Sequence, residues 1–416
     1  MGAGTNPVRL ALVPRDGMFF KDGRGWFTSE SNHGRSLAWP FPTTVLGALR
    51  TAYGRAREQQ TGTPIARADW PRVTADVILG PVLALRRPFG AGFAAGHRMW
   101  PVPADALYLE GRTEVERLDP RRPPLPPEVQ TLGRDDDPAR EALWRPTLDD
   151  AAKPLVPPAF WPDADFAAWL AGHGIAVRPE AERRSHALPR RTLGHVGIDG
   201  RTGTARDGAL FAEECLETLT GGASDRQEWA LGLAAALPSV PAGLLSRPFT
   251  LGGQGRLARP EPLDAALFEP PPEVLAAFRA GPRGIRVVVV SPAGQPAGWL
   301  PRGLGRVPVA GGPEPAEEYR GALPGVSGEV VLRAAFVPRA VHVSGWDMAA
   351  RGGRGAPKAT RRLVPAGAVY FFEKTSGAAF DESEGRALWL TALGDGADEG
   401  LSRVVAGVWR PTEVGA

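Results

Sequence analysis

The chain has 416 residues, 43% of them hydrophobic and 23% charged, and its formal net charge is +3. This length exceeds the ~250–300 residues that one hydrophobic core usually serves, so we expect two domains. A single cysteine excludes an internal disulfide and a multi-cysteine zinc site. No signal peptide and no apolar run near ~18 residues is recognisable, so we expect a cytoplasmic protein without a membrane span.

The first part of the chain predicts a strand, a loop and a helix. Residues 8–12 alternate apolar and other side chains, which is typical of a strand. A glycine-rich loop over residues 16–39 follows, and Pro42 then starts a helix. The apolar side chains expected on one face of this helix are Val45, Leu49 and Tyr53. Two further strand candidates are residues 76–86 and 106–110.

Residues 119–163 are rich in proline and charge, which predicts a surface insertion or lid. The whole variable insertion is placed at about residues 119–185. Asp135, Asp136 and Asp137 stand in its middle. Three adjacent carboxylates can bind a metal, but a solvated run of loop charges is the commoner arrangement, and we expect no metal site there.

The next block combines predicted helices with a turn and a linker. Residues 210–219 and the alanine-rich residues 228–237 are predicted to be helical. Cys215 falls in the first of these segments and is interpreted as a small buried apolar residue. Residues 248–258 predict a turn, and the prolines of residues 259–272 predict a linker.

The C-terminal part predicts a regular alternation of strands and helices. The expected strands are residues 285–290, 329–337, 364–373 and 402–409, with one helix at 384–393 and another within 291–328. This is the β-α-β-β-α-β order of a ferredoxin-like domain. We therefore predict an α+β protein of two tandem ferredoxin-like (RRM-like) domains, residues 1–265 and 273–416, with long Gly/Pro-rich insertions.

Common catalytic and cofactor motifs are missing from the sequence. It contains no phosphate-binding P-loop, no nucleophile elbow and no His-Glu-x-x-His metal motif. Residues 253–258 match a loose dinucleotide fingerprint, but Pro260 and Pro262 break the helix that this motif needs. The histidines are scattered and never stand at ligand spacing. We therefore expect no catalytic residue, no metal site and no cofactor.

Four groups of segments, taken in order, resemble one protein family. They are residues 14–24, 39–40, 42–44 and 47–50; residues 195–199 and 202–211; residues 251–256; and residues 345–347, 357–358 and 361–373. Together they resemble the third subunit of type III-B (Cmr) CRISPR effector complexes, in the RAMP superfamily. The segment 203–211 is also similar to the equivalent type III-A subunit. The family's glycine-rich loop before the last strand is only loosely matched by Gly394, Gly396 and Gly400.

This resemblance implies a non-catalytic RNA-binding subunit that acts in antiviral defence. Members of the family lie beside the large polymerase/cyclase-like subunit, and the two together bind the 5′ tag of the guide RNA. A backbone RAMP subunit packs on the other side, and target RNA is met only indirectly. These partners follow from the resemblance and not from the composition.

Arginine supplies most of the positive charge, since only four of the 49 basic residues are lysine. A GC-rich genome gives this bias, and so does phosphate binding by the guanidinium group. Within residues 351–362, Lys358, Arg361 and Arg362 stand in a glycine-rich loop that suits a phosphate chain. A solvated loop has the same composition, so both interpretations stay open.

Three further cations lie near the N-terminus. Lys21 and Arg24 belong to the first glycine-rich loop, and Arg50 to the helix that follows it. Contact with RNA or with a partner subunit is the functional interpretation. A solvated helix face is the alternative for Arg50.

A strand-like stretch carries Arg190, Arg191 and His195. Alternation places Arg191, Leu193 and His195 on one side. Basic and apolar groups on one face suit bases stacked over a sheet or thumb. An edge strand protected by charges is the equally good alternative.

Gly252, Gly253 and Gly255 predict a tight turn whatever the function. Gln254 and Arg256 are the side chains of this turn that we expect to contact RNA. The glycines themselves let the backbone approach an anion closely.

His33 supports a competing hypothesis. Related RAMP nucleases that process guide-RNA precursors can use a histidine near this place as a general acid or base, since metal-free RNA cleavage needs such a group. The alternative function is therefore a metal-independent guide-RNA processing endonuclease. An ordinary loop histidine is the commoner case.

Overall fold

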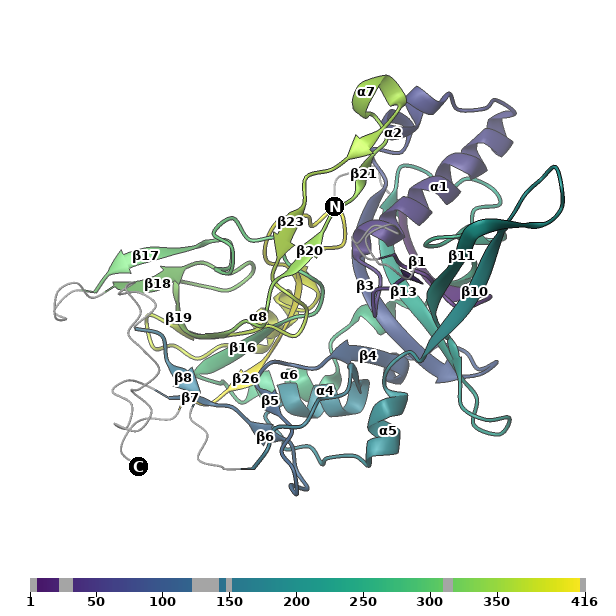
Figure 1. Ribbon diagram of the computed structural model, residues 1–416. Helices are drawn as coiled ribbons and strands as arrows, with labels where there is room; N and C mark the ends of the chain where they lie inside the picture. Colours follow the sequence, from purple (N-terminus) through teal and green to yellow (C-terminus); the bar gives the residue numbers. More distant parts are fainter. Residues whose placement is uncertain (1–5, 22–32, 122–141, 147–151, 310–316, 412–416) are drawn as a thin grey trace.

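A computed structural model describes residues 6–21, 33–121, 142–146, 152–309 and 317–411. The fold is mixed α+β, built mostly from strands in two large antiparallel sheets with few helices (Figure 1). One sheet belongs to the N-terminal half of the chain and the other to the C-terminal half. The predicted α+β class is confirmed, and the two sheets are consistent with two domains.

The N-terminal sheet places its first strand between two strands that come much later in the chain. Its order is β14 (Phe249–Thr250), β15 (Leu257–Pro262), β1 (Asn6–Pro14), β13 (Gln227–Leu237), β3 (Ile78–Pro88), β4 (Arg98–Pro101) and β9 (Phe160–Pro162). The strands predicted at 8–12 and 76–86 are β1 and β3, whereas the strand predicted at 106–110 is reduced to β5 (Ala106–Leu107). Leu10 and Leu12 of β1 pack beneath the helix α1 (Pro42–Thr61).

The helix α1 forms as its sequence predicts. Pro42 occupies its first turn, where a missing backbone N–H costs no helical hydrogen bond. Val45, Leu49 and Tyr53 are buried against the sheet. Gly62 ends the helix with φ +67°, a left-handed conformation that glycine adopts without strain.

The two helices predicted in the middle of the chain are wrong. Residues 210–219 mostly belong to β11 (Ala205–Leu216), and residues 228–237 form β13. Because β13 pairs with β1 and β3 and is buried on both faces, it shows no alternation that would identify a strand. Pairing on both edges overrides the weak helical preference of its alanines. Cys215 is buried as predicted, but in a strand.

The linker predicted at residues 259–272 is also wrong in part. β15 runs through Pro260 and Pro262, and a 3₁₀ turn η4 (Ala265–Phe268) leads to the helix α6 (Pro272–Arg279). β14 pairs only with Leu257 and Ala258. The two prolines therefore lie where one edge of β15 is open, so their missing N–H groups cost little.

The C-terminal sheet contains the four strands that the sequence predicts. Its order is β17 (Leu304–Pro308), β18 (Glu317–Gly321), β19 (Val330–Phe336), β24 (Val369–Lys374), β16 (Gly284–Val289), β26 (Arg403–Trp409) and β25 (Thr391–Ala392). The helix predicted within 291–328 is wrong for the described part, where β17 and β18 extend the sheet as a hairpin. Gly303, with φ +92°, is one of several glycines and prolines that oppose a helix there.

The helix predicted at 384–393 is shorter, as α8 (Glu382–Ala387). Asp381 caps its start by accepting the backbone N–H of Glu384 at 2.9 Å, and the Glu384 carboxylate accepts the N–H of Asp381 in return. Leu390 has φ +55°, a backbone conformation that no helix can contain.

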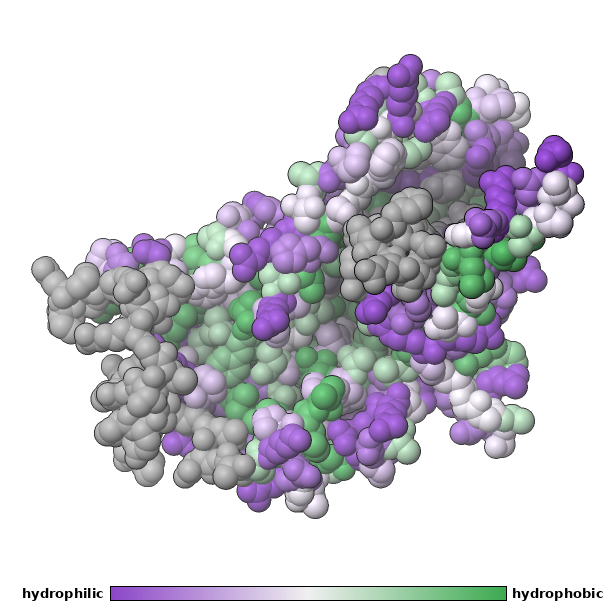
Figure 2. Space-filling view, in the orientation of Figure 1, coloured by the Kyte–Doolittle hydropathy of each residue, from purple (hydrophilic) through white to green (hydrophobic). Residues whose placement is uncertain are grey.

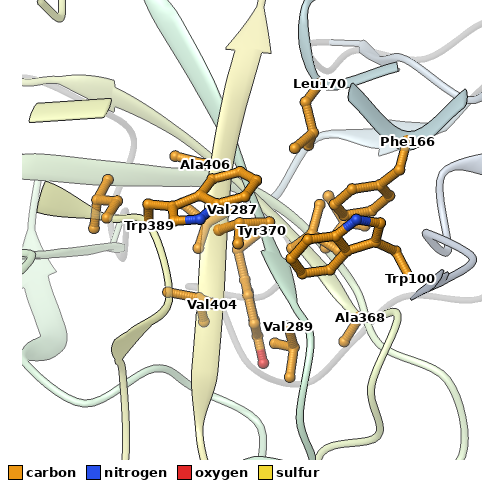
Figure 3. Close-up of a cluster of buried hydrophobic side chains, with 14 of the residues drawn as sticks. Trp100, Phe166, Leu170, Val287, Val289, Ala368, Tyr370, Trp389, Val404 and Ala406 are labelled. Carbon is orange, nitrogen blue, oxygen red and sulfur yellow. The ribbon is translucent and has the colours of Figure 1, made fainter. Parts of the chain in front are cut away.

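One hydrophobic core joins the two halves. The helix α4 (Asp163–Leu170) contributes Phe166 and Leu170, which point toward Val287 and Ala406 of the C-terminal sheet (Figure 3). Trp100 stacks on Phe166 with 4.9 Å between ring centroids. Each such side chain stabilises the fold by ~1.5–3 kcal/mol when fully buried. The two sheets are therefore held together by packing and not by a linker alone.

A buried ion pair adds to this junction. Asp105 of the N-terminal half accepts a hydrogen bond from the guanidinium of Arg286 in β16, and both side chains are almost fully buried. Asp105 also accepts the indole N–H of Trp169 at 3.0 Å. Removing one partner of such a pair costs ~3–5 kcal/mol, because the other charge is left buried and unpaired.

The predicted surface lid at 119–163 is wrong at its end. Phe160 and Trp161 lie in β9 and are buried, because they cover the edge of the N-terminal sheet. Asp135, Asp136 and Asp137 lie outside the described residues. The remaining short elements are β2 (His33–Gly34), η2 (Arg67–Asp69), α2 (Trp70–Val73), η3 (Ala95–His97), β6 (Glu116–Arg117), β7 (Pro120–Arg121), β8 (Arg145–Pro146), α5 (Glu180–Ser185) and β12 (Leu219–Thr220).

Two projections leave the sheets (Figure 1). The hairpin consists of β10 (Arg190–Ile198) and β11. The arm, residues 341–363, leaves the C-terminal sheet and ends beside α1 and α2. Its elements are β20 (Val341–Val343), β21 (Trp346–Asp347), α7 (Ala350–Gly353), β22 (Ala356–Pro357) and β23 (Arg361–Leu363).

Candidate nucleic-acid interface

A groove of about 790 Å³ lies between the helix α1 and the arm. One wall comes from the N-terminal half and the other from the C-terminal half, so the groove exists only because the two halves pack together. Of the residues predicted to contact RNA, the groove lining includes Lys21, Arg50, Gly252, Gly253 and Lys358.

The glycine-rich turn at 251–256 forms the floor beside Lys21. Gly253 donates its backbone N–H to the carbonyl of Phe19 at 2.8 Å. Gly252 has φ +78°, and a Cβ there would lie 2.4 Å from the same carbonyl oxygen. A Cβ on Gly253 would lie 2.7 Å from the Phe19 ring. Both glycines are therefore required by packing, and they bring the turn against the segment that carries Lys21.

Arg50 lies on the α1 wall of the groove. Its guanidinium donates to the carbonyl oxygens of Ala75 and Val77 at 3.2 and 3.4 Å. These bonds fix the side chain against the segment before β3. Gly47, one turn earlier on α1, leaves open space next to it.

The arm supplies the opposite wall. Lys358 is exposed, and its ammonium has no ion pair within the described part of the chain. Arg361 pairs with Glu399 at 2.8 Å, and Glu399 belongs to the glycine-rich segment before β26. Arg362 is exposed on β23. Of the three predicted cations of this loop, Arg361 is thus neutralised by its partner.

The glycine-rich segment before β26 also reaches the groove. Glu399 lines it, and the N–H of Leu79 in β3 donates to the carbonyl of Asp398 at 2.9 Å. A Cβ on Gly400 would lie 2.8 Å from the backbone oxygen of Gly80. Each half of the chain therefore places the glycine-rich loop that precedes its last long strand against the groove.

The predicted cations of the hairpin lie apart from this lining. Arg190 pairs with Glu214, and it also donates to the carbonyl of Ser36 at 3.0 Å. Arg191 pairs with Glu217 at 2.8 Å. Ser36 forms a β-bridge with Lys21, so the base of the hairpin adjoins the groove.

His195 stacks on Phe211 across the hairpin, with ring centroids 5.0 Å apart and an interplanar angle of 16°. Leu193 and His195 are both half-buried, whereas Arg191, the third residue of the predicted face, is exposed. Figure 2 shows hydrophilic residues over the tips of the hairpin and the arm, and apolar residues in the hollow between the two halves.

The two side chains predicted as contacts in the 251–256 turn take different positions. Gln254 is exposed, with φ +60°. Arg256 points inward, where it pairs with the fully buried Glu213 at 2.7 Å and donates to the Sγ of Cys215 at 2.9 Å. Burial opposes its charge, but the hydrogen bond to Glu213 raises the pKa of Arg256 overall. Burial, with a smaller contribution from Glu213, raises the pKa of the Cys215 thiol to about 11.

The remaining candidates are His33 and Arg24. His33 is half-buried in β2, beside Ala212 of β11, and does not belong to the groove lining. Arg24 lies outside the described residues. Over the described ranges, no three His, Cys, Asp or Glu side chains are placed to hold a metal ion. No helix of the described chain is long and apolar enough to cross a membrane.

The groove also contains residues that sequence reasoning missed. Trp70 and Thr74 contribute to the α1 side, and Trp346 and Met348 to the arm. Trp346 stands in a segment that carried the family resemblance. Its position next to a basic, glycine-rich loop was the signal from which the sequence could have named it as a site residue. Nothing in the sequence places Trp70 opposite it.

Comparison with known proteins gives one family. The family model described as CRISPR-associated protein (Cas_Cmr3) matches residues 10–409, which include both sheets and the groove. No curated protein matches the chain. Two cryo-EM structures of the type III-B Cmr-beta complex contain similar chains. In the complex bound to cognate target RNA and AMPPnP, a chain with 12% identity aligns over 87% of this chain and 86% of its own, with a TM-score of 0.41. In the complex bound to cognate target RNA, a chain with 11% identity aligns over 87% of this chain and 86% of its own, with a TM-score of 0.39.

Proposed function

Because the chain belongs to the Cmr3 family, the third subunit of type III-B CRISPR effector complexes, we propose that it is a non-catalytic RNA-binding subunit that holds the 5′ tag of the guide RNA. One observation carries the proposal: the groove collects Lys21, Arg50 and Lys358 together with glycine-rich loops from both halves. Cations and accessible backbone along one groove suit a single-stranded phosphate chain.

The proposed RNA path continues beyond the groove in two directions. Arg362 extends it along the arm, and Arg190, Arg191 and His195 extend it along the hairpin, whose base meets Lys21 through Ser36. The proposed neighbours are the large polymerase/cyclase-like subunit and a backbone RAMP subunit, with target RNA reached through the guide.

The proposed domains are two ferredoxin-like units, residues 1–265 and 273–416. Taken in chain order, β1, β3, β13 and β15 lie in the sheet as 4-1-3-2, and β16, β19, β24 and β26 repeat this order. Each unit keeps a different helix: α1 follows the first strand of one, and α8 precedes the last strand of the other. The repeated strand order supports the proposal more strongly than the helices do.

The alternative function, RNA processing by His33, has less support because His33 lies outside the groove. We expect His33→Ala to leave target-RNA cleavage by the assembled complex unchanged, since we propose that this subunit is not catalytic. A metal-free nuclease activity on repeat RNA that disappears in His33→Ala would instead establish the processing enzyme.

The test of the proposed function is a salt titration with the full-length chain and a synthetic guide RNA that carries its 5′ tag. Phosphate contacts release counterions, so the affinity should fall steeply as salt rises. Addition of the large subunit should tighten binding, because the tag is then held from two sides. An affinity that is flat from low to high salt, or equal for RNA without the tag in the assembled complex, would contradict the proposal.

A further inference from the structure

Trp346 is a large aromatic side chain that the arm holds in solvent. It is 55% exposed, although tryptophan gains more from burial than most side chains. It pairs with Pro357 between β21 and β22, and the N–H of Lys358 donates to the carbonyl of Gly345 at 2.8 Å. The backbone that carries the ring is therefore tied down on both sides.

Gly355 fixes the ring itself. This glycine has φ +82°, and a Cβ there would lie 2.2 Å from Nε1 and 2.8 Å from Cε2 of Trp346. Only a residue without a side chain can place its backbone so close to the indole. Gly355 thus supports one part of the ring, while more than half of the side chain remains open to a ligand.

The ligand side of the ring faces a charged groove. Trp346 and Met348, which is 45% exposed, line the same groove as Arg50 and Lys358. The groove volume of about 790 Å³ falls within the ~300–1,000 Å³ range of pockets that bind small molecules. Aromatic faces beside cations are how proteins bind unpaired nucleotides: the base stacks and the phosphate meets the cation.

We propose that Trp346 is the stacking platform for one unpaired base of the guide RNA's 5′ segment, with the adjoining phosphate at Lys358. This inference rests on the proposed function and assigns the base-binding residue of its site. An exposed tryptophan can also anchor a protein partner. The cations of the groove and its two glycine-rich loops favour RNA over the apolar patch of a protein partner.

The experiment measures RNA affinity of the full-length chain with Trp346→Ala, Trp346→Leu and Trp346→Phe. Loss of one stacked base should weaken binding about 5- to 150-fold in the alanine variant, which corresponds to ~1–3 kcal/mol per base. Leucine should fail like alanine because it is apolar but not aromatic, and phenylalanine should restore most of the affinity. The salt dependence should stay parallel to that of the parent, because stacking releases no counterion.

A guide RNA with single abasic positions identifies the base. One abasic position should weaken binding to the parent and have no further effect on Trp346→Ala. Phe89→Ala is the matched control, because Phe89 is also 55% exposed but does not line the groove. Its RNA affinity should equal that of the parent, and melting temperatures of all variants should agree.

The outcomes separate the two levels of the proposal. Normal affinity of Trp346→Leu, with the steep salt dependence kept, overturns the stacking platform and leaves the RNA-binding groove intact. Normal RNA affinity combined with loss of co-purification with the large subunit shows that the ring contacts protein, which also overturns it. An RNA affinity of the unmutated chain that does not change with salt concentration overturns the proposed function.

Discussion

The groove and the hairpin both carry the cations expected at an RNA interface, but their charges are arranged differently. On the hairpin, Arg190 and Arg191 pair with Glu214 and Glu217. In the groove, Lys358 has no ion pair among the described residues. A cation that already has a carboxylate partner has less to gain from a phosphate. Lys358 is therefore better placed to meet a phosphate than Arg190 or Arg191, although the hairpin is the more prominent projection.

This difference comes from strand register. Arg190 pairs with Leu216 and Thr192 with Glu214, so Glu214 is the diagonal neighbour of Arg190 on the same face of the hairpin. A shift of one residue would move each side chain to the other face of the hairpin. The number of arginines in a segment therefore does not predict its electrostatic potential until the carboxylates that pair with them are known.

The largest effect should come from removing the cations around the groove and the arm. The salt slope is the steepness with which log affinity falls as log salt concentration rises. Lys21→Ala, Lys358→Ala and Arg362→Ala combined should lower it by ~2, since each single-strand phosphate contact contributes ~0.7. If affinities converge near 1 M salt, this is a loss of about 100-fold at 0.1 M. A gel-shift salt titration measures it, with melting temperature as the control for folding. An unchanged slope would place the RNA elsewhere.

A smaller loss should follow from the arm alone. Replacing Lys358, Arg361 and Arg362 by alanine removes three charges, but Arg361 is paired with Glu399. The salt slope should therefore fall by ~1.4, and affinity at 0.1 M by about 25-fold. Arg361→Ala alone is the matched control and should bind like the parent. A full loss of ~2.1 in slope would mean that Arg361 leaves Glu399 for the RNA.

The hairpin should respond less than the groove. Arg190→Ala with Arg191→Ala removes two charges that are already paired with carboxylates. We therefore expect affinity to fall less than ~5-fold, which is the loss expected for one phosphate contact made by an unpaired cation. Glu214→Gln with Glu217→Gln tests the same idea in reverse and should tighten RNA binding. If the arginine variant lost as much as the arm variant, the hairpin would be a primary site.

The smallest effect concerns pH. Burial, followed by the charges of Arg86 and Arg178, lowers the pKa of His186, which lies beside the base of the hairpin. Its folded-state pKa is below the unfolded value near 6.5. The free energy of unfolding is therefore highest above about pH 6.5 and declines as the pH falls below it. His186→Gln should flatten this decline in melting temperature between pH 7 and pH 5.

The sequence predicts the fold best where one physical signal dominates. The apolar β-branched run of residues 285–290 predicts β16, and a proline followed by an apolar face predicts α1. β13 was missed because a strand buried on both faces has no period of two, and its alanines favour a helix locally. Only its pairing with β1 and β3 decides its conformation.

The sequence predicts the candidate site in part. Lys21, Gly252 and Lys358 were named from three distant segments, and the groove brings them together. The inward turn of Arg256 toward Glu213 was not predictable, because it depends on how the 251–256 turn packs on β11. Residue types and loop composition suggest contacts, whereas the tertiary arrangement decides which side chains remain available.

The core shared by the two halves has a consequence for how the protein is made. Trp100 and Phe166 are synthesised long before Val404 and Ala406, the residues of β26 that belong to the same core. Until that strand has left the ribosome, these aromatic rings pack on each other but lack the C-terminal part of their core, and the apolar surface left exposed favours aggregation. The nascent N-terminal half therefore lacks part of its core until β26 has been synthesised, and the groove forms only after the arm and Glu399 have followed α1.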